Sequence, residues 1–210
     1  MRYLVLSDIH GGSEELKQAL RFFQIFNCDF LILLGDLLNH GPRNKLPASY
    51  DPMNVGNLLN QFKEKIISIR GNCDSEVDGM VFDFPCNAAY GYLVVSTSRG
   101  IKKIFLTHGH LHKIETKEQI SKLGLNEGDI VLSGHTHVSG IFFKESEGDI
   151  VLSGHTHVSG IFFKESGVIN INPGSISIPK GGTQKGFALI SENAIELYNL
   201  DGNLFNSYIF

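Results

Sequence analysis

Short apolar runs separated by helical and polar stretches mark the first third of the chain. Three of these runs predict buried strands: residues 3–6, 30–34 and 66–69. Apolar residues recur at helical spacing over 16–23, and we expect Ser13 to cap this helix at its N-terminus. Pro52 predicts the start of a second helix, which we expect to run through Lys65. The resulting β-α-β-α-β order is typical of a parallel sheet with right-handed crossovers.

The remainder of the chain is richer in short strands than in helices. Its apolar runs predict the following strands: residues 92–96, 103–107, 129–132, 168–170, 187–190, 194–200 and 204–209. A helix is expected over 116–123, and Asp201-Gly202-Asn203 predicts a hairpin turn. A parallel half followed by an antiparallel half predicts an α/β fold in which two sheets stack face to face with helices outside. Ligands of such folds bind beyond the carboxyl ends of the strands.

An internal repeat interrupts this pattern. The segment EGDIVLSGHTHVSGIFFKES fills residues 127–146 (copy one) and again residues 147–166 (copy two) without one change. Perfect identity, surface positions included, indicates a recent duplication, natural or artificial, and two copies are too few for a solenoid. We therefore expect one domain over residues 1–210 in which a single strand position is filled by one copy.

The other copy is then expected to be extruded as a long loop, at a cost in loop closure of about 1.6 kcal/mol. Copy two is slightly favoured for the strand position, because it keeps a tight hairpin that leads into Gly167 and Val168. Copy one in the strand position, and a mixed arrangement divided at the Val-Ser-Gly turn, are the alternatives.

Composition and charge narrow the class of protein. The 210 residues include 42% hydrophobic and 19% charged residues, as in globular proteins with a substantial core. A net charge of −4 without a dense Lys/Arg run is evidence against an extended nucleic-acid surface, and no apolar stretch approaches the roughly 20 residues of a membrane span. The three cysteines are widely spaced, and a cleavable leader would take Asp8 and His10 with it. We expect a cytoplasmic protein without a disulfide framework; a homo-oligomer is compatible with these features.

Polar clusters rich in carboxylates and imidazoles follow several of the predicted strands. They are Asp8-Ile9-His10, Gly35-Asp36, Gly71-Asn72-Cys73-Asp74, Thr107-His108-Gly109-His110, and Gly-His-Thr-His with His135 and His137 in copy one or His155 and His157 in copy two. Asp36 has two oxygens that can bridge two ions, Asn72 offers an amide oxygen and His108 an imidazole. Each cluster alone is ordinary for a turn, a cap or a core histidine, but together they predict a metal site. Nitrogen and oxygen ligands without thiolate suit Mn²⁺, Fe, Zn²⁺ or Ni²⁺ and suit Ca²⁺ poorly.

These motifs resemble the five sequence blocks of the calcineurin-like metallophosphoesterase superfamily. Within it, residues 35–44, 70–78, 107–110 and 172–175 are similar to the small bacterial YfcE-type phosphodiesterases. The resemblance covers most of the chain. It implies a four-layer α/β/β/α sandwich of two mixed sheets flanked by helices.

The resemblance also implies a site for two divalent metal ions, usually Mn²⁺. One ion would be held by Asp8, His10, Asp36 and the second histidine of a repeat, His157 or His137. The other would be held by Asp36, Asn72, His108 and the first histidine, His155 or His135. A hydroxide that bridges the two ions would attack the phosphorus in line, and the ions would stabilise the charge on the phosphoryl oxygens.

One position departs from the common superfamily pattern. Many members place a histidine directly after the asparagine of the third block, where it protonates the leaving group, whereas this chain has Cys73, as its YfcE-type relatives do. A thiol is a poor substitute. The proton is therefore expected from His110, from Asp74 through water, or from no side chain at all, which would favour substrates with good leaving groups.

Candidate substrate contacts lie on the loop after the second strand. Arg43 can bind an oxyanion through two N–H groups, and His40 is a further candidate, although a solvated loop explains His40 equally well. His112 is expected at the surface or behind the ligands rather than in the chemistry. The sequence thus predicts a metal-dependent hydrolase of small phosphodiesters. The alternative is a protein-binding scaffold of the same fold, like the retromer subunit that resembles this family, but the presence of every ligand type favours catalysis.

Overall fold

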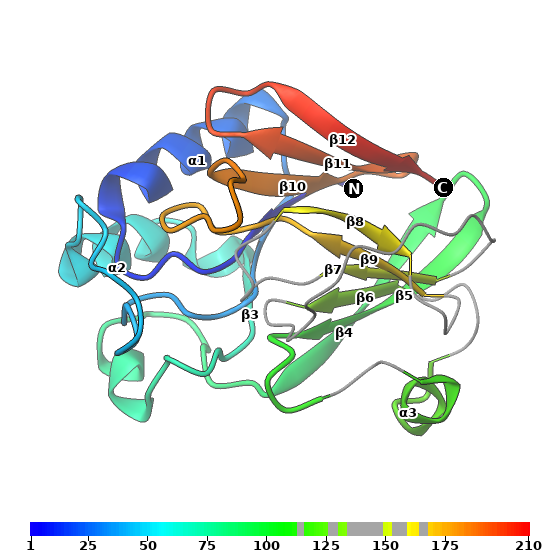
Figure 1. Ribbon diagram of the computed structural model, residues 1–210, viewed down its shortest axis with the longest axis horizontal. Coiled ribbons are helices and arrows are strands. Elements are labelled where there is room, and N and C mark those ends of the chain that lie inside the picture. The colour runs from blue at the N-terminus through cyan, green and yellow to red at the C-terminus, as the bar shows by residue number, and fades with distance from the viewer. Residues whose placement is uncertain (113–115, 126–129, 134–148, 153–158, 164–167) are drawn as a thin grey trace.

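Two six-stranded sheets stack face to face in this computed structural model (Figure 1). The structure describes residues 1–112, 116–125, 130–133, 149–152, 159–163 and 168–210. Sheet 1 has the strand order β12-β11-β10-β1-β2-β3, and sheet 2 has the order β4-β5-β6-β7-β9-β8. The strands of sheet 1 are β1 (Tyr3–Leu6), β2 (Phe30–Leu33), β3 (Ile66–Ser68), β10 (Gly186–Ile190), β11 (Ala194–Asn199) and β12 (Leu204–Ile209). Those of sheet 2 are β4 (Tyr90–Thr97), β5 (Gly100–Thr107), β6 (Ile130–Ser133), β7 (Asp149–Leu152), β8 (Gly160–Phe163) and β9 (Val168–Asn172).

Helices cover the outer faces of both sheets. Helices α1 (Ser13–Ile25) and α2 (Pro52–Asn60) pack with the Leu4 and Leu6 side of β1 in one apolar cluster. Val5 points the other way and joins a second cluster, between the sheets, as expected for a strand whose side chains alternate in direction. Helix α3 (Lys117–Lys122) buries Ile120 against Phe105 on the outer face of sheet 2. The predicted four-layer α/β/β/α sandwich is confirmed.

The division of the strands between the sheets differs from the prediction. Strands β1, β2 and β3 are parallel, as expected, but β10, β11 and β12 join the same sheet in antiparallel pairs instead of forming part of the second sheet. The five residues of β10 are all buried, and a strand that is apolar on both faces needs a central position. Sheet 2 in turn has a parallel centre, in which β5, β6, β7 and β9 run the same way.

Both copies of the repeat contribute a strand to sheet 2, so the predicted extrusion of one copy is wrong. Copy one forms β6 and copy two forms β7, and the two pair in parallel with identical residues opposite one another, Ile130 with Ile150 through Leu132 with Leu152. Copy two also forms β8, which pairs with β9 as the expected hairpin. Adding one strand to a parallel sheet satisfies the backbone hydrogen bonds of the apolar Ile-Val-Leu run, whereas extrusion would leave that run unpaired.

Two predicted helix boundaries need correction. Gly12, not Ser13, is the N-cap of α1, and the Ser13 hydroxyl donates to the Ser49 carbonyl oxygen at 3.0 Å. Helix α2 does not reach Lys65 but ends at Asn60, and a short 3₁₀ turn follows at Lys63–Lys65. The side chain of Asn60, the last residue of α2, bonds to a distant loop: it donates to the Val81 carbonyl oxygen at 2.9 Å and accepts from the Asp83 N–H at 2.8 Å. Among the described residues, no helix is long and apolar enough to cross a membrane.

Candidate metal centre

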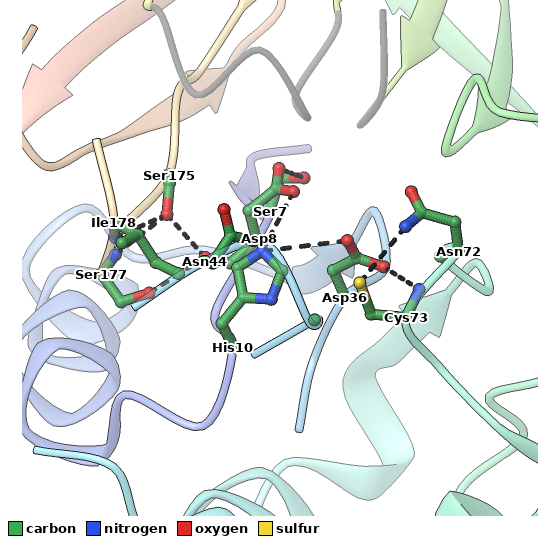
Figure 2. A network of polar contacts seen from close by, with 12 residues as sticks. Ser7, Asp8, His10, Asp36, Asn44, Asn72, Cys73, Ser175, Ser177 and Ile178 are labelled. Carbon is green, nitrogen blue, oxygen red and sulfur yellow. Dashed lines mark hydrogen bonds and ion pairs between the residues drawn. The ribbon is translucent and has the colours of Figure 1, made fainter. Parts of the chain in front are cut away.

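The polar clusters converge where β1, β2, β3 and β5 end. Asp8 and His10 follow β1, Asp36 follows β2, and His108 follows β5, and all four are fully buried. Asn72 lies on the loop after β3, on the far side of Asp36 in Figure 2. Because parallel strands bring their carboxyl ends to the same edge of a sheet, three of these clusters come from sheet 1 and His108 approaches from sheet 2.

Two groups of ligand atoms share the Asp36 carboxylate. The side-chain ligand atoms of Asp8, Asp36 and His108 lie within 4.8 Å of one another, and so do those of His10, Asp36 and Cys73. Asp36 belongs to both groups, which is the placement that a carboxylate bridging two ions requires. The predicted sets are also compatible with these positions, since His10 Nε2 lies 3.7 Å from Asp8 Oδ1 and His108 Nε2 lies 3.1 Å from Asn72 Oδ1; the Cys73 sulfur beside His10 was not among the predicted ligands.

The ligand loops adopt an unusual backbone. Asp8, His10 and Asp36 have φ angles of 54°, 47° and 56°, in the left-handed region that non-glycine residues rarely occupy. Pairing between the two loops holds them there, since the Asp8 N–H donates to Gly35 O at 3.1 Å and the His10 N–H to Asp36 O at 2.9 Å. Such strain costs on the order of 1–3 kcal/mol per residue and persists where the surroundings enforce it, commonly at functional sites.

The hydroxyl groups of three serines support Asp8. The Asp8 carbonyl oxygen accepts from Ser175 Oγ at 2.7 Å and from Ser177 Oγ at 3.2 Å (Figure 2). Ser7 Oγ donates to one carboxylate oxygen of Asp8 at 2.6 Å. Ser175 lies in the motif 172–175 and Ser7 precedes Asp8 directly, so sequence position hinted at both. Ser177 carries no such signal.

The two buried histidines are oriented by backbone carbonyl groups. His10 Nδ1 lies 2.7 Å from Asn39 O, and His108 Nδ1 lies 2.5 Å from Leu34 O. A carbonyl oxygen only accepts, so each Nδ1 carries the hydrogen and each Nε2 faces the centre of the site. This arrangement, with one ring nitrogen held from behind, is typical of metal-ligating histidines.

Oxygen atoms surround both inward-facing nitrogens. His10 Nε2 lies 3.7 Å from Asp8 Oδ1 and 3.8 Å from Asp36 Oδ2. His108 Nε2 lies 3.5 Å from the same Asp36 oxygen and 3.1 Å from Asn72 Oδ1. An ion with ligands at 2.0–2.2 Å separates those ligands by about 3 Å, so small movements of these groups would bring them to the spacing of metal ligands.

The electrostatics favour a positive charge at this position. Burial lowers the pKa of His108, but the hydrogen bond and charge of Asp36 outweigh burial and raise that pKa to about 9. Burial likewise opposes the charged form of His10, yet the Asp8 and Asp36 carboxylates leave its pKa above the ordinary value. Burial raises the pKa of Asp36, and the contact with His108 more than reverses this effect. Buried carboxylates and inward-facing imidazoles fit divalent cations, which would replace the protons on the imidazoles.

The Asp74 carboxylate connects two of the loops that carry the ligand groups. Its carboxylate accepts backbone N–H groups of Asp36 at 2.8 Å, Leu37 at 2.7 Å and Gly71 at 2.7 Å. These bonds tie the loop after β2 to the loop after β3. Burial and the charge of Asp36 raise the pKa of Asp74. Both oxygens are thus engaged by the backbone, which supports a positioning role for Asp74; proton donation by Asp74 through water stays one of the predicted alternatives.

The remaining candidates for proton donation differ in their surroundings. The Cys73 N–H donates to Asp36 Oδ1 at 2.8 Å, and burial together with the Asp36 charge raises the pKa of its thiol. His110 lies beside His108, with ring centroids 5.4 Å apart, and burial and the charge on His108 lower its pKa. His112 packs its ring against Tyr90, away from the ligand groups. A protonated thiol of high pKa and a largely neutral imidazole are both weak sources of a proton at neutral pH.

A pocket of about 570 Å³ opens beside the ligand groups. Asp36, Asn72 and Cys73 form the part of its wall nearest the cluster, and Arg43 also lines it; a contact between Arg43 and substrate stays a prediction. His40 is not among the lining residues, and its ring packs edge-on against Tyr50 at 5.7 Å between centroids. The pocket is lined by Asp36, Asn39, Gly41, Pro42, Arg43, Asn44, Asn72, Cys73 and Lys180. Lys180 was not predicted from the sequence.

The histidines of the repeat lie outside the described residues. These are His135 and His137 in copy one and His155 and His157 in copy two. The strands that precede them are described: Ser133 at the end of β6 pairs with Thr107, the residue before His108, and β7 is one strand farther from β5. Their assignment as ligands stays a prediction.

Replacing Gly71 by alanine is expected to disable the centre. A methyl group at this position would overlap the backbone nitrogen and the carboxylate of Asp36. We expect Mn²⁺ affinity to fall at least tenfold and the fold to lose about 1–3 kcal/mol, measured by metal titration and by denaturant unfolding. Gly79→Ala is the matched control, because its added methyl group meets its nearest neighbour, Asn87 Nδ2, at 3.6 Å. Unchanged affinity in Gly71→Ala would contradict the assigned geometry.

Comparisons with known proteins give one consistent answer. The model of the calcineurin-like phosphoesterase family matches residues 1–159, and the calcineurin-like phosphoesterase superfamily domain matches residues 141–194. Phosphodiesterase YfcE of Escherichia coli K12 is 35% identical over 201 residues, covering 96% of this chain and 93% of the relative. The probable metallophosphoesterase YsnB of Bacillus subtilis is 24% identical over 97% of this chain and 94% of its own length. The solved structure of the E. coli YfcE phosphoesterase covers 100% of this chain and 99% of its own chain, with a TM-score of 0.77 at 32% identity.

Proposed function

The chain belongs to the calcineurin-like phosphoesterase family, as a homologue of YfcE and a metal-dependent phosphoric ester hydrolase, and we propose that it hydrolyses small phosphodiesters with two divalent cations. The observation that supports two cations most directly is the place of Asp36 in both ligand groups. Mn²⁺ is the cation we favour because the family resemblance implies it, and the nitrogen and oxygen ligands also suit Zn²⁺, Fe and Ni²⁺. We further propose a cytoplasmic location, which the three free cysteines support.

Different residues of the chain would position the metal ligands and bind the substrate. Two divalent cations at this centre would activate water and stabilise charge on the phosphoryl oxygens. Asp74 and the Cys73 N–H fix the position of Asp36, and the carbonyl groups behind His10 and His108 fix the orientation of the two rings. Arg43 lines the adjoining pocket, where its guanidinium can bind an oxyanion of the substrate. This organisation would hold the reacting groups in place before the reaction begins.

Leaving groups of low pKa are the expected substrates at neutral pH. The thiol of Cys73 holds its proton too tightly, and His110, with its lowered pKa, is mainly neutral at pH 7. Neither group is well matched to general acid catalysis, which works best when the donor pKa lies near the working pH. An aryl ester that leaves without a proton therefore suits the site.

Hydrolysis of bis-p-nitrophenyl phosphate by metal-stripped protein tests the proposal. We expect little turnover without added metal and clear turnover with Mn²⁺. Folded protein that stays inactive with each of the four candidate metals would support a scaffold role or a site broken by the duplication. Deleting residues 147–166 separates these two outcomes, because it leaves one intact copy of the repeat.

Metal binding is expected to release protons at neutral pH. The pKa of about 9 leaves His108 charged at pH 7 in the metal-free protein, whereas a ligating imidazole is neutral. Affinity for Mn²⁺ should therefore rise about tenfold from pH 7 to pH 8 for each displaced proton. The stability of the metal-free fold depends on pH in the opposite direction. The raised pKa of His108 stabilises the metal-free fold fully below pH 6.5, and this stabilisation is lost as the pH rises through about 9.

Calorimetric titrations in buffers of different ionisation enthalpy count these protons. His108→Gln should release about one proton fewer than the native chain. His112→Gln is the control, because its ring packs against Tyr90 and Phe105 rather than in the ligand groups. An affinity for Mn²⁺ that does not change between pH 7 and pH 8 would contradict the ligand role of His108.

A further inference from the structure

The pocket beside the ligand groups carries two cationic side chains on different segments. Arg43 belongs to the loop between β2 and α2, and Lys180 belongs to the connection by which the chain returns from β9 in sheet 2 to β10 in sheet 1 (Figure 1). Asp36 is the acidic residue among the lining residues, and it faces the candidate metal centre. The outer part of the pocket is therefore positively charged and flanked by amide groups.

Among the residues that the structure describes, no carboxylate pairs with either cation. Within the described part of the chain, Arg43 and Lys180 take part in no ion pair, whereas Lys185, five residues farther on, pairs with Glu15 at 2.6 Å. Both side chains are exposed to solvent and free to meet a ligand. A pair of unmatched cations in one pocket favours an anionic ligand.

The backbone around Lys180 is held by hydrogen bonds on both sides, to the Asp8 loop before it and within a turn after it. On one side, Ser175 and Ser177 hold the carbonyl oxygen of Asp8. On the other, the Lys180 carbonyl oxygen accepts from the N–H of Thr183 at 3.1 Å and from its hydroxyl at 2.8 Å. Lys180 therefore lies in a turn that closely follows a segment bonded to the Asp8 loop, which keeps it near the metal ligands.

The pocket is larger than a scissile phosphate needs. Its volume of about 570 Å³ lies in the range of sites that hold whole small molecules, about 300–1,000 Å³. The phosphate would lie at the Asp36 end, beside the candidate metals. One ester arm of the substrate would then extend along the loop that carries Arg43 toward Lys180.

We propose that this enzyme selects phosphodiesters that carry a second anionic group, a carboxylate or a phosphate, on one ester arm, which Lys180 and Arg43 bind. The proposal rests on the phosphodiesterase function above and names its substrate class. Lys180 is the specificity-determining residue in this assignment, and Arg43 provides the second positive charge of the anion site. Because both side chains are exposed, the preference is expected to be about fivefold at low salt and to weaken as salt is added.

A matched pair of substrates tests this preference. These are 2-carboxyethyl p-nitrophenyl phosphate and 2-carbamoylethyl p-nitrophenyl phosphate, which differ by one charge at nearly the same size. We expect kcat/KM to be about fivefold higher for the carboxylate, mainly through KM, with the preference lost in Lys180→Met and kept in Lys180→Arg. Lys45→Met is the control, because this exposed lysine lies near Arg43 in sequence but outside the pocket lining. Equal kcat/KM for the two substrates, or a preference that survives Lys180→Met, would overturn the assignment.

Binding of the products separates this inference from the proposed function. The dissociation constants of 2-carboxyethyl phosphate and 2-carbamoylethyl phosphate are measured calorimetrically with native protein and Lys180→Met. A Lys180-dependent preference for the carboxylate without any hydrolysis would uphold the anion site and refute the phosphodiesterase. Hydrolysis of both substrates without such a preference would refute the anion site and leave the phosphodiesterase standing.

Discussion

Replacing Asp36 by asparagine is expected to lower Mn²⁺-dependent phosphodiester hydrolysis about a thousandfold, because the change removes the charge shared by both ligand groups. The amide oxygen of the new residue can still accept from the Cys73 N–H, as Asp36 Oδ1 does at 2.8 Å. The fold should therefore survive, with an unfolding midpoint somewhat below that of the native metal-free chain at pH 7, because the charge that stabilises protonated His108 is lost. Steady-state hydrolysis of bis-p-nitrophenyl phosphate and denaturant unfolding measure the two effects.

Asp83→Asn provides the charge-matched control. The Asp83 side chain is 62% exposed and pairs with Lys63 at 3.7 Å. Asp83 belongs to neither ligand group. The Asp83→Asn substitution removes the same formal charge as Asp36→Asn. It should leave turnover within about twofold of the native value, because exposed ion pairs contribute little to stability. Native turnover in Asp36→Asn would contradict the two-metal account.

Replacing one or the other histidine pair of the repeat is expected to have unequal effects on hydrolysis. Replacing His135 and His137 by alanine should lower hydrolysis at least about a hundredfold, since loss of two ligands exceeds the effect of losing one supporting group. Replacing His155 and His157 should leave most of the activity. The reason is strand order: β6, which precedes the first pair, lies directly beside β5 and ends level with Thr107, whereas β7 is one strand farther from His108.

This experiment has its control built in, because the two double variants change identical residues in identical local sequences. Hydrolysis of bis-p-nitrophenyl phosphate and Mn²⁺ affinity are measured for both. Inactivation by the second pair alone would transfer the ligand role to copy two, the copy that the sequence slightly favoured. Equal partial losses would show that both copies occupy the site in different molecules.

Local patterns in the sequence were sufficient to predict most helices and strands and to locate the ligand clusters. The apolar runs that became β1 and β2 carry no polar interruption, and each ends at the residues that reach the centre, Asp8 and Asp36. The stripe of apolar residues predicted α1, and Asp201-Gly202-Asn203 forms the expected turn between β11 and β12. These features depend on neighbours in sequence, which pattern analysis can read.

Features that depend on distant residues could not be predicted. Whether Ser13 or Gly12 caps α1 is decided by the Ser49 carbonyl group, which draws the Ser13 hydroxyl away. The role of Asp74 follows from three N–H groups on two loops, and Lys180 reaches the pocket through a connection between the sheets. The duplicated strands posed the same difficulty, because pairing in the sheet, rather than any local preference, accommodates both copies.

Counting the Mn²⁺ ions that the protein binds, while hydrolysis is followed in the same samples, tests the two-metal account most directly. Metal-stripped protein is titrated with Mn²⁺, free ion is measured by electron paramagnetic resonance, and turnover of bis-p-nitrophenyl phosphate is recorded at each step. The account predicts two bound ions per chain, magnetic coupling between them through the shared Asp36 carboxylate, and full activity only when both are bound. Full activity with one ion per chain, or two ions without coupling, would contradict it.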